Sequence, residues 1–169
     1  MNYFELYNIP VSLQVDATTL KQKFYELSRK YHPDFFTNAT EEEQAAVLEK
    51  SSMVNKAFKV FTHSDELIKY VLVLKNLLEE EEKYKLPNSF LVDVMEINEA
   101  LMDAKMEDNK ETMTNLETEI AHLQLKIYEP VKQIVEHYKE GITTQEELLQ
   151  VKEYYYKKKY LNRILSTLS

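Results

Sequence analysis

With 169 residues, of which 44% are hydrophobic and 30% charged, the chain can bury the core of one large or two small globular domains. Its net charge of −8 argues against nucleic acid and anionic membrane surfaces as partners, and the absence of cysteine excludes disulfides, thiolate catalysis and thiolate metal ligation. One glycine and four prolines leave little material for the turns of a sheet, so the sequence predicts an all-α fold.

Capping residues and apolar spacing predict the first two helices. Asn2 and Glu5 can form a capping box for a short helix over residues 3–7. Asp16 can cap the next helix, in which apolar side chains recur every three or four residues. The members of this apolar stripe are Leu20, Phe24, Leu27 and Tyr31.

A proline and a second capping box predict a helical hairpin. Pro33 ends the helix before it, because the residue preceding a proline is driven out of the α region and into a loop. Thr40 and Glu43 then open a helix over about residues 41–62. Two amphipathic helices joined by a short loop pack antiparallel, so we expect residues 32–34 at one exposed end of the hairpin.

The triplet His32-Pro33-Asp34 at this tip is open to several interpretations. A catalytic site would need a nucleophile, and Ser28, the nearest hydroxyl, is separated from His32 by the helix break that Pro33 imposes. One imidazole and one carboxylate are too few to hold a metal ion without further ligands. The two remaining interpretations of the triplet are an ordinary turn and a contact surface for a partner.

Longer stretches of sequence resemble a known family. YHPD at residues 31–34 and VNKAFKVF at residues 54–61 resemble a J domain, the DnaJ-type module that stimulates ATP hydrolysis by DnaK-type chaperones. The opening YFELYNIP at residues 3–10 is similar to the N-terminus of the HscB or Jac-type co-chaperones of iron–sulfur cluster assembly.

This resemblance implies a chaperone-binding surface on the first half of the chain. Its members would be His32, Pro33 and Asp34, with Lys23, Arg29 and Lys30 on the preceding helix. They would contact a DnaK/HscA-type chaperone near its interdomain linker. A rigid carboxylate can accept a charge-assisted bond from a partner arginine, and the cations can steer towards an acidic surface. Many J domains carry a lysine after the triplet, where this chain has Phe35 and one positive charge fewer.

The middle of the chain predicts a fourth helix and a linker. Ser64 can cap a helix over roughly residues 65–80, and we interpret Glu79–Glu82 as its solvated end. The predicted domains are a J domain over residues 1–78, a linker over residues 79–88 and a three-helix bundle over residues 89–169.

The helix predicted over about residues 89–107 has two neighbouring apolar strips. The first strip contains Phe90, Val94, Ile97 and Leu101, and the second contains Leu91, Val92, Met95 and Met102. One strip suffices to join a bundle. The second strip is either covered by further helices or presented to another protein, and the sequence leaves both possibilities open.

Two further helices complete the predicted bundle. Apolar spacing continues over roughly residues 110–139 and across Pro130, which predicts one kinked helix that ends at Gly141. Thr144 and Glu147 cap the last helix, which we expect to continue almost to the end of the chain.

The second half also resembles HscB-type proteins, in which a C-terminal three-helix bundle binds the IscU-type scaffold on which the iron–sulfur cluster is built. The similar stretch is SFLVDVMEINE at residues 89–99. Family contact positions fall on Leu91, Val92, Met95, Glu96 and Glu99, and a further aromatic contact from the last helix is expected at Tyr156. The apolar members of this set belong to the second strip.

One enzyme class has a partial match. Glu119 and His122 fit the Glu-x-x-His motif of carboxylate-bridged di-iron bundles, but such sites need two copies of the motif and two further inward glutamates. No other histidine has a glutamate three positions before it. Because no Gly-rich phosphate loop is present either, we expect no metal, no ATP and no cofactor to bind.

These features predict an adaptor that performs no bond chemistry of its own. The resemblance implies that the J domain engages the ATP-bound chaperone, that the bundle carries the scaffold protein to it, and that hydrolysis promotes cluster transfer. A J-domain protein with a different client is the alternative. Without a secretion signal or a membrane-spanning stretch, we expect the bacterial cytoplasm, or the processed form of a mitochondrial protein.

Overall fold

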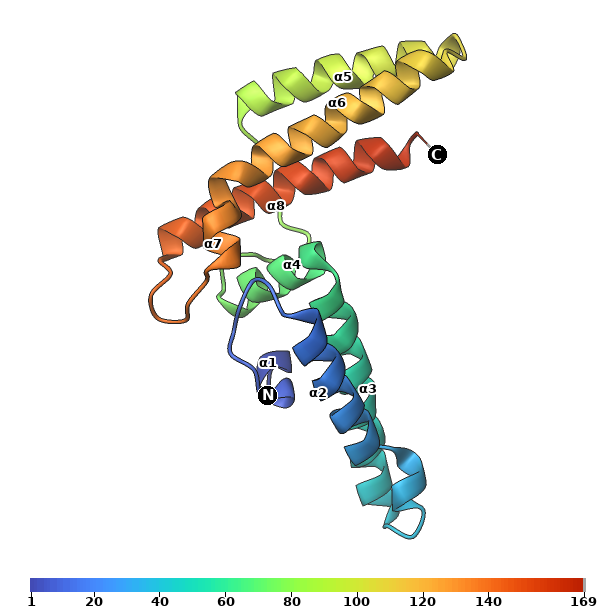
Figure 1. Cartoon of the computed structure of the whole chain (residues 1–169), viewed down its shortest axis with the longest axis vertical. Coiled ribbons are helices and arrows are strands. Elements are labelled where there is room, and N and C mark those ends of the chain that lie inside the picture. The colour runs from blue at the N-terminus through green and yellow to red at the C-terminus, as the bar shows by residue number, and fades with distance from the viewer. Residues whose placement is uncertain (169) are drawn as a thin grey trace.

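The computed structural model describes residues 1–168, and every regular element in that range is a helix (Figure 1). The predicted all-α fold is therefore confirmed. In chain order the elements are α1 (Tyr3–Tyr7), α2 (Ala17–Lys30), the 3₁₀ helix η1 (Pro33–Phe36), α3 (Glu41–Thr62), α4 (Ser64–Leu74), α5 (Asn88–Met106), α6 (Lys110–Tyr128), the 3₁₀ helix η2 (Glu129–Val131), α7 (Lys132–Glu136) and α8 (Gln145–Ser166).

The predicted N-terminal caps at Asn2, Asp16, Thr40 and Thr144 are all formed. Each side chain accepts the backbone N–H three residues further on, at 2.9–3.1 Å. The glutamates that follow Asn2 and Thr144 also accept the backbone N–H of the cap, which completes two capping boxes. The box predicted at Thr40 and Glu43 has only its threonine half. These helix starts could be predicted because both partners of each bond lie within one turn of the chain.

α2 and α3 pack as the predicted antiparallel hairpin, and α1 lies against its base (Figure 1). The ring centres of Phe4 and Tyr7 lie 5.2 and 5.1 Å from that of Phe61 on α3. The buried hydroxyl of Tyr7 donates a hydrogen bond to the backbone carbonyl of Val54 at 2.7 Å. α1 therefore stabilises the hairpin through aromatic packing and one buried hydrogen bond.

The fourth helix is shorter than predicted. α4 ends at Leu74, six residues before the expected end at residue 80. Asn76 has a positive φ of 59°, and the N–H of Leu77 turns back to the carbonyl of Leu72 at 2.9 Å. This left-handed turn is a common way for a helix to stop, and an asparagine tolerates it better than most residues.

The surroundings of α4 correct two further predictions. His63, not Ser64, precedes the helix as its N-cap, and it makes no capping bond through its side chain. The acids Glu79–Glu82 lie between α4 and α5 and are not a solvated helix end. Glu82 is half-buried and forms an ion pair of 2.7 Å with Lys152 of α8.

The helix predicted over residues 110–139 is divided into three pieces. α6 ends at Tyr128, and η2 and α7 follow it. Pro130 stands inside the 3₁₀ turn, where its missing N–H and its ring interrupt the α-helical hydrogen bonds, so the break is more than a kink. Gly141, with a φ of 79°, does not end a helix, because α7 already ends at Glu136 and Gly141 lies in the loop between α7 and α8.

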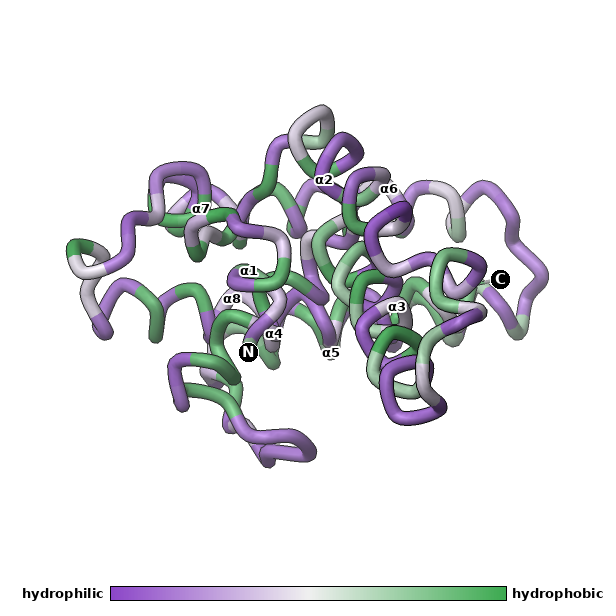
Figure 2. The backbone as a smooth tube through the Cα atoms, turned by 90° about the horizontal axis from the view of Figure 1, so that it is seen from below, coloured by the Kyte–Doolittle hydropathy of each residue, from purple (hydrophilic) through white to green (hydrophobic). Residues whose placement is uncertain are grey.

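α5, α6 and α8 lie side by side as the predicted bundle, and α4 packs against α8 (Figure 1). Figure 2 shows hydrophobic and hydrophilic residues alternating along the helices, as amphipathic helices require. Two ion pairs, Lys158–Asp65 at 2.7 Å and Lys75–Glu140, join α4 and the residue after it to α8 and the loop before α8. The domain limits at residues 78 and 89 stay a prediction, and Ser169 lies outside the described residues.

Replacing Tyr7 by Phe removes the buried hydroxyl and keeps the ring. We expect the free energy of unfolding to fall by about 1–2 kcal/mol, because the hydrogen bond to Val54 is lost. Urea denaturation followed by circular dichroism measures the change. Tyr25→Phe, which alters an exposed side chain, is the matched control and should leave the stability unchanged. An equal loss in both variants would contradict a special role for the Tyr7 bond.

The Glu82–Lys152 pair predicts a pH dependence of stability. The hydrogen bond from the Lys152 ammonium holds the pKa of the Glu82 carboxyl below its ordinary value. A carboxyl with a lowered pKa in the folded state stabilises the fold above its ordinary pKa, and this contribution is lost as the pH falls through the folded value. Between about pH 5 and about pH 3, Lys152→Met should therefore lose less unfolding free energy than the parent chain. Urea titrations at both pH values measure this change. If the unfolding free energy of Lys152→Met falls by as much as that of the parent chain, the linkage is disproved.

Candidate functional site

The hairpin tip is a short 3₁₀ helix, η1, where the sequence predicts a loop. His32 precedes it with extended backbone, which confirms that Pro33 ends α2. The Nδ1 atom of His32 accepts the backbone N–H of Asp34 at 3.2 Å, and the carbonyl of His32 accepts that of Phe35 at 3.1 Å. The triplet is thus held by bonds to its own backbone.

The two polar side chains of the triplet point into solvent. Nδ1 of His32 accepts the backbone N–H of Asp34 and lies 3.7 Å from the carboxylate of the same residue. With 85% of its side chain exposed, the Asp34 carboxylate is available to another molecule.

Gln44 of α3 supports the tip, and sequence reasoning missed it. Its Nε2 lies 3.0, 3.1 and 3.3 Å from the backbone carbonyls of Phe36, Thr37 and Ala39, so its two hydrogens are shared among three acceptors. These bonds tie the chain after η1 to the first turn of α3. The only signal in the sequence is a long amide side chain four residues after the cap Thr40.

The predicted cations of α2 divide between two faces. A groove of about 600 Å³, here called the tip groove, is lined by Tyr25, Ser28, Arg29, His32, Asp34 and Phe35. At ~100° per residue, Lys23 and Lys30 project about 140–160° away from Tyr25, on another side of the helix. Of the predicted cations in the described chain, only Arg29 therefore lines the tip groove beside the triplet.

α5 has the two predicted apolar strips, and they differ in exposure. Phe90, Val94, Ile97 and Leu101 of the first strip are buried against the bundle. In the second strip Val92, Met95 and Met102 are exposed, and Leu91 is half-buried. Of the two possibilities left open by the sequence, the structure supports a strip presented at the surface.

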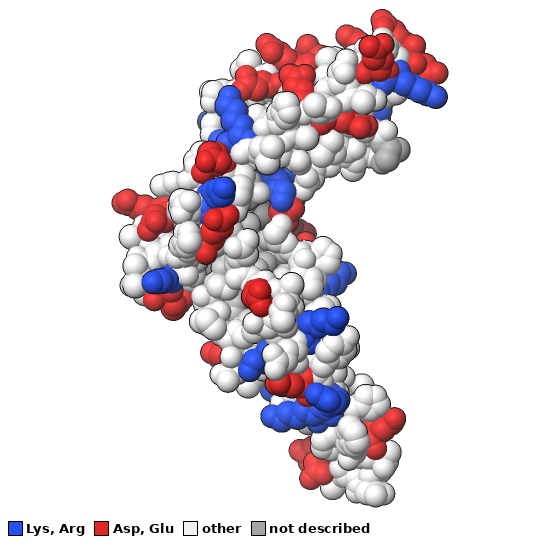
Figure 3. Space-filling view, in the orientation of Figure 1, with Lys and Arg blue, Asp and Glu red and all other residues white. Residues whose placement is uncertain are grey.

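Acidic and aromatic side chains border this exposed strip. Glu96 and Glu99 are both exposed on α5, and Figure 3 shows acidic side chains gathered along the outer edge of the bundle. Leu91 lines a pocket together with Tyr156, whose ring is stacked on Tyr84 with centres 4.5 Å apart. Burial raises the pKa of Tyr156 to about 12, so the hydroxyl is neutral at ordinary pH. Leu91 and Tyr156 thus share one surface, as the family resemblance implies.

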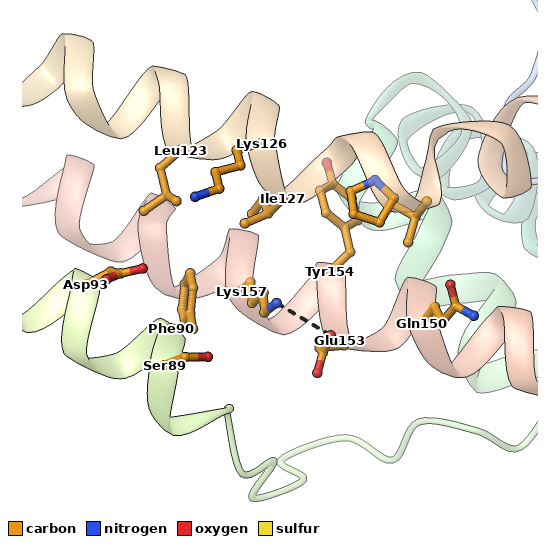
Figure 4. Close-up of a pocket in the computed structure, with 12 residues that line it drawn as sticks. Ser89, Phe90, Asp93, Leu123, Lys126, Ile127, Gln150, Glu153, Tyr154 and Lys157 are labelled. Carbon is orange, nitrogen blue, oxygen red and sulfur yellow. Dashed lines mark ion pairs between the residues drawn. The ribbon is translucent and has the colours of Figure 1, made fainter.

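Another cleft, of about 450 Å³, lies between α5, α6 and α8 (Figure 4). Lys157 extends over the ring of Phe90 at 5.6 Å and pairs with Glu153 at 3.4 Å. Lys126 and Asp93 add one charge of each sign to its lining. Because the charges are mixed and Lys157 is paired, the cleft has no clear preference for a charged ligand.

Neither a di-iron site nor a membrane span finds support in residues 1–168. Glu119 and His122 are both exposed on α6, whereas di-iron ligands must point into the core of the bundle. No group of three or more His, Cys, Asp or Glu side chains in that range could hold a metal ion. None of the described helices combines the length and apolar character needed to cross a membrane.

Comparisons with known proteins identify relatives for both halves of the chain. Residues 86–169 match the family model described as the HSCB C-terminal oligomerisation domain. The co-chaperone protein HscB of Buchnera aphidicola is 35% identical over 119 residues, which cover 69% of this chain and 68% of that protein. The co-chaperone protein HscB homolog of Colwellia psychrerythraea is 35% identical over 106 residues, which cover 62% of this chain and 61% of that protein.

Solved structures are similar along almost the whole chain. The crystal structure of human co-chaperone protein HscB has a TM-score of 0.80 and 27% identity, and the match covers 99% of this chain and 80% of that one. The chaperone HscB from Vibrio cholerae has a TM-score of 0.66 and 22% identity with full coverage of both chains, and so shows the shared fold alone. The predicted family is confirmed, and the chain belongs to the HscB family of co-chaperones.

Proposed function

We propose that the chain is an adaptor that carries an IscU-type iron–sulfur scaffold protein to a DnaK/HscA-type chaperone and stimulates the ATPase of that chaperone. Membership of a co-chaperone family supports this role. The observation that carries it is the triplet His32-Pro33-Asp34, which is locked by its own backbone and exposed at the end of the hairpin. Its geometry suits contact with another protein and lacks the groups that catalysis would need.

The chaperone face uses a rigid anion beside a cation. The Asp34 carboxylate can accept a charge-assisted bond from a partner arginine, and little conformational freedom is lost because the backbone around it is already ordered. Arg29 lies beside it, and Lys23 and Lys30 on another side of α2 can steer the encounter. The ATP-bound chaperone exchanges between forms that can and cannot hydrolyse ATP. By binding the hydrolysis-competent form more tightly, the adaptor shifts this equilibrium towards it without any bond chemistry of its own.

The scaffold face combines an apolar centre with an acidic rim. Leu91, Val92 and Met95 supply apolar area on one side of α5, and Glu96 and Glu99 lie next to them. Interfaces between proteins have this anatomy, with apolar side chains at the centre and charged side chains at the rim. The acidic rim suits a scaffold surface with basic side chains.

The two faces lie far apart, at opposite ends of the molecule (Figure 1). The hairpin tip belongs to the proposed J domain over residues 1–78, and α5 belongs to the proposed bundle over residues 89–169. A chaperone at the tip would leave α5 uncovered, so both partners can bind at the same time. This arrangement is what an adaptor between two proteins requires.

Asp34→Ala should abolish stimulation of the chaperone ATPase. Losing one partner of a charge-assisted bond should weaken the productive complex by at least about 30-fold. The measurement is ATP turnover by the chaperone, with and without scaffold, as the concentration of this protein is raised. Glu119→Ala, which removes an exposed carboxylate from α6, is the matched control and should stimulate like the parent. Full stimulation by Asp34→Ala would refute the proposed chaperone face.

The double variant Leu91→Ala with Met95→Ala should lose binding to the IscU-type scaffold by about 100-fold, because two apolar side chains leave the centre of the interface. A pull-down followed by calorimetry measures the affinity. Met106→Ala is the matched control, because Met106 is 86% exposed on the same helix and lies outside the proposed contact. Parent-like binding by the double variant would refute the scaffold face. If the parent chain itself fails to bind the scaffold, the alternative of a different client is favoured.

A further inference from the structure

Two aromatic side chains beside the triplet differ from the other aromatic side chains of the protein. The chain has 12 tyrosines and 7 phenylalanines, and within residues 1–168 only Tyr25 and Phe35 are exposed, at 53% and 73%. Both line the tip groove. Aromatic rings contribute much of the apolar area buried in cores and interfaces, so two uncovered rings in one groove indicate a contact surface.

The tip groove has a defined geometry. Ser28 and Arg29 lie three and four residues after Tyr25 on one face of α2, and His32 lines the groove just beyond the end of the helix. Phe35 continues this row from η1, with its ring roughly edge-on to the His32 ring and the centres 6.0 Å apart. The groove therefore has aromatic groups along its length, and Arg29 and Asp34 supply one charge of each sign.

We propose that Tyr25 and Phe35 form an aromatic clamp that receives an aliphatic side chain of the ATP-bound chaperone. The inference rests on the proposed function, because it assigns the same partner to an additional part of the same surface. Continuity supports this partner, since His32 and Asp34 line the same groove as the two rings. A protein that binds the Asp34 carboxylate from this side covers the rings as well.

The charges around the rings favour an aliphatic occupant over a cationic one. Arg29 lines the groove, and the ammonium of Lys21 lies 6.0 Å from the ring centre of Tyr25. A basic side chain next to the Tyr25 ring would meet these two like charges, whereas a partner arginine at Asp34 would meet a carboxylate. Phe35 stands where many J domains carry a lysine, so this position offers apolar area in place of a positive charge. Binding at this position should therefore depend little on salt concentration.

The test is a titration of chaperone ATPase stimulation at about 50 mM and about 300 mM KCl, where screening of exposed charges differs strongly. Phe35→Ala and Tyr25→Ala should each raise the concentration for half-maximal stimulation by about tenfold at both salt concentrations. Phe35→Lys should also be weaker than the parent, and its half-maximal concentration should rise more steeply with salt, because a cation now replaces the ring.

Two reference variants separate the possible results. Leu125→Ala removes a side chain that is 69% exposed on α6 and should behave like the parent, and Asp34→Ala should not stimulate at all. If the parent stimulates, Asp34→Ala does not, and the three groove variants match the parent, the clamp is wrong while the proposed function stands. If Phe35→Lys stimulates better than the parent at both salt concentrations, the clamp is also wrong. If the parent fails to stimulate, the proposed function and the clamp fall together.

Discussion

Burial of the short helix α4 is the constraint on which the arrangement of the molecule depends. Leu67, Ile68, Val71 and Leu72 are all buried, and α4 contacts α3 on the hairpin and α8 in the bundle. Each such side chain contributes about 1.5–3 kcal/mol on burial, whereas a partly exposed ion pair at the same junction contributes about 0–1 kcal/mol. Apolar packing therefore holds the two halves together, and the ion pairs adjust how they are oriented.

The ends of α1, α4 and α5 depend on asparagine or aspartate in a chain that has only one glycine. Asn8, Asn76 and Asp108 all have positive φ values, from 51° to 59°. After each of them, the next N–H bonds back to a carbonyl five residues earlier, at 2.9–3.0 Å. The turn at Asn76 stops α4 before the chain crosses to the bundle. The turn at Asp108 folds α6 back onto α5, so the buried strip of α5 faces α6 and α8 while its second strip remains outside.

The two proposed faces use different physical interactions. The chaperone face is small and rigid, with one carboxylate in a fixed backbone and two uncovered rings beside it. The scaffold face is a broad apolar strip along one helix with carboxylates at its border. Both depend on secondary structure that is stable without a partner, since η1 is supported by Gln44 of α3 and α5 by its buried strip. The protein can therefore act by binding alone, with little ordering needed when a partner arrives.

The sequence by itself determined the starts of α1, α2, α3 and α8, the break at Pro33 and the two strips of α5, because each depends on residues within one or two helical turns. The sequence could not locate the ends of α4 and α6, because apolar side chains beyond those ends continue the helical spacing. Leu78 and Val135 are examples, and both are buried although they lie outside these helices. The tertiary structure alone decided that the second strip of α5 is uncovered, that Glu82 pairs with Lys152, and that two rings share the tip groove. These features depend on which distant segments cover a surface, and helical periodicity carries no information about that.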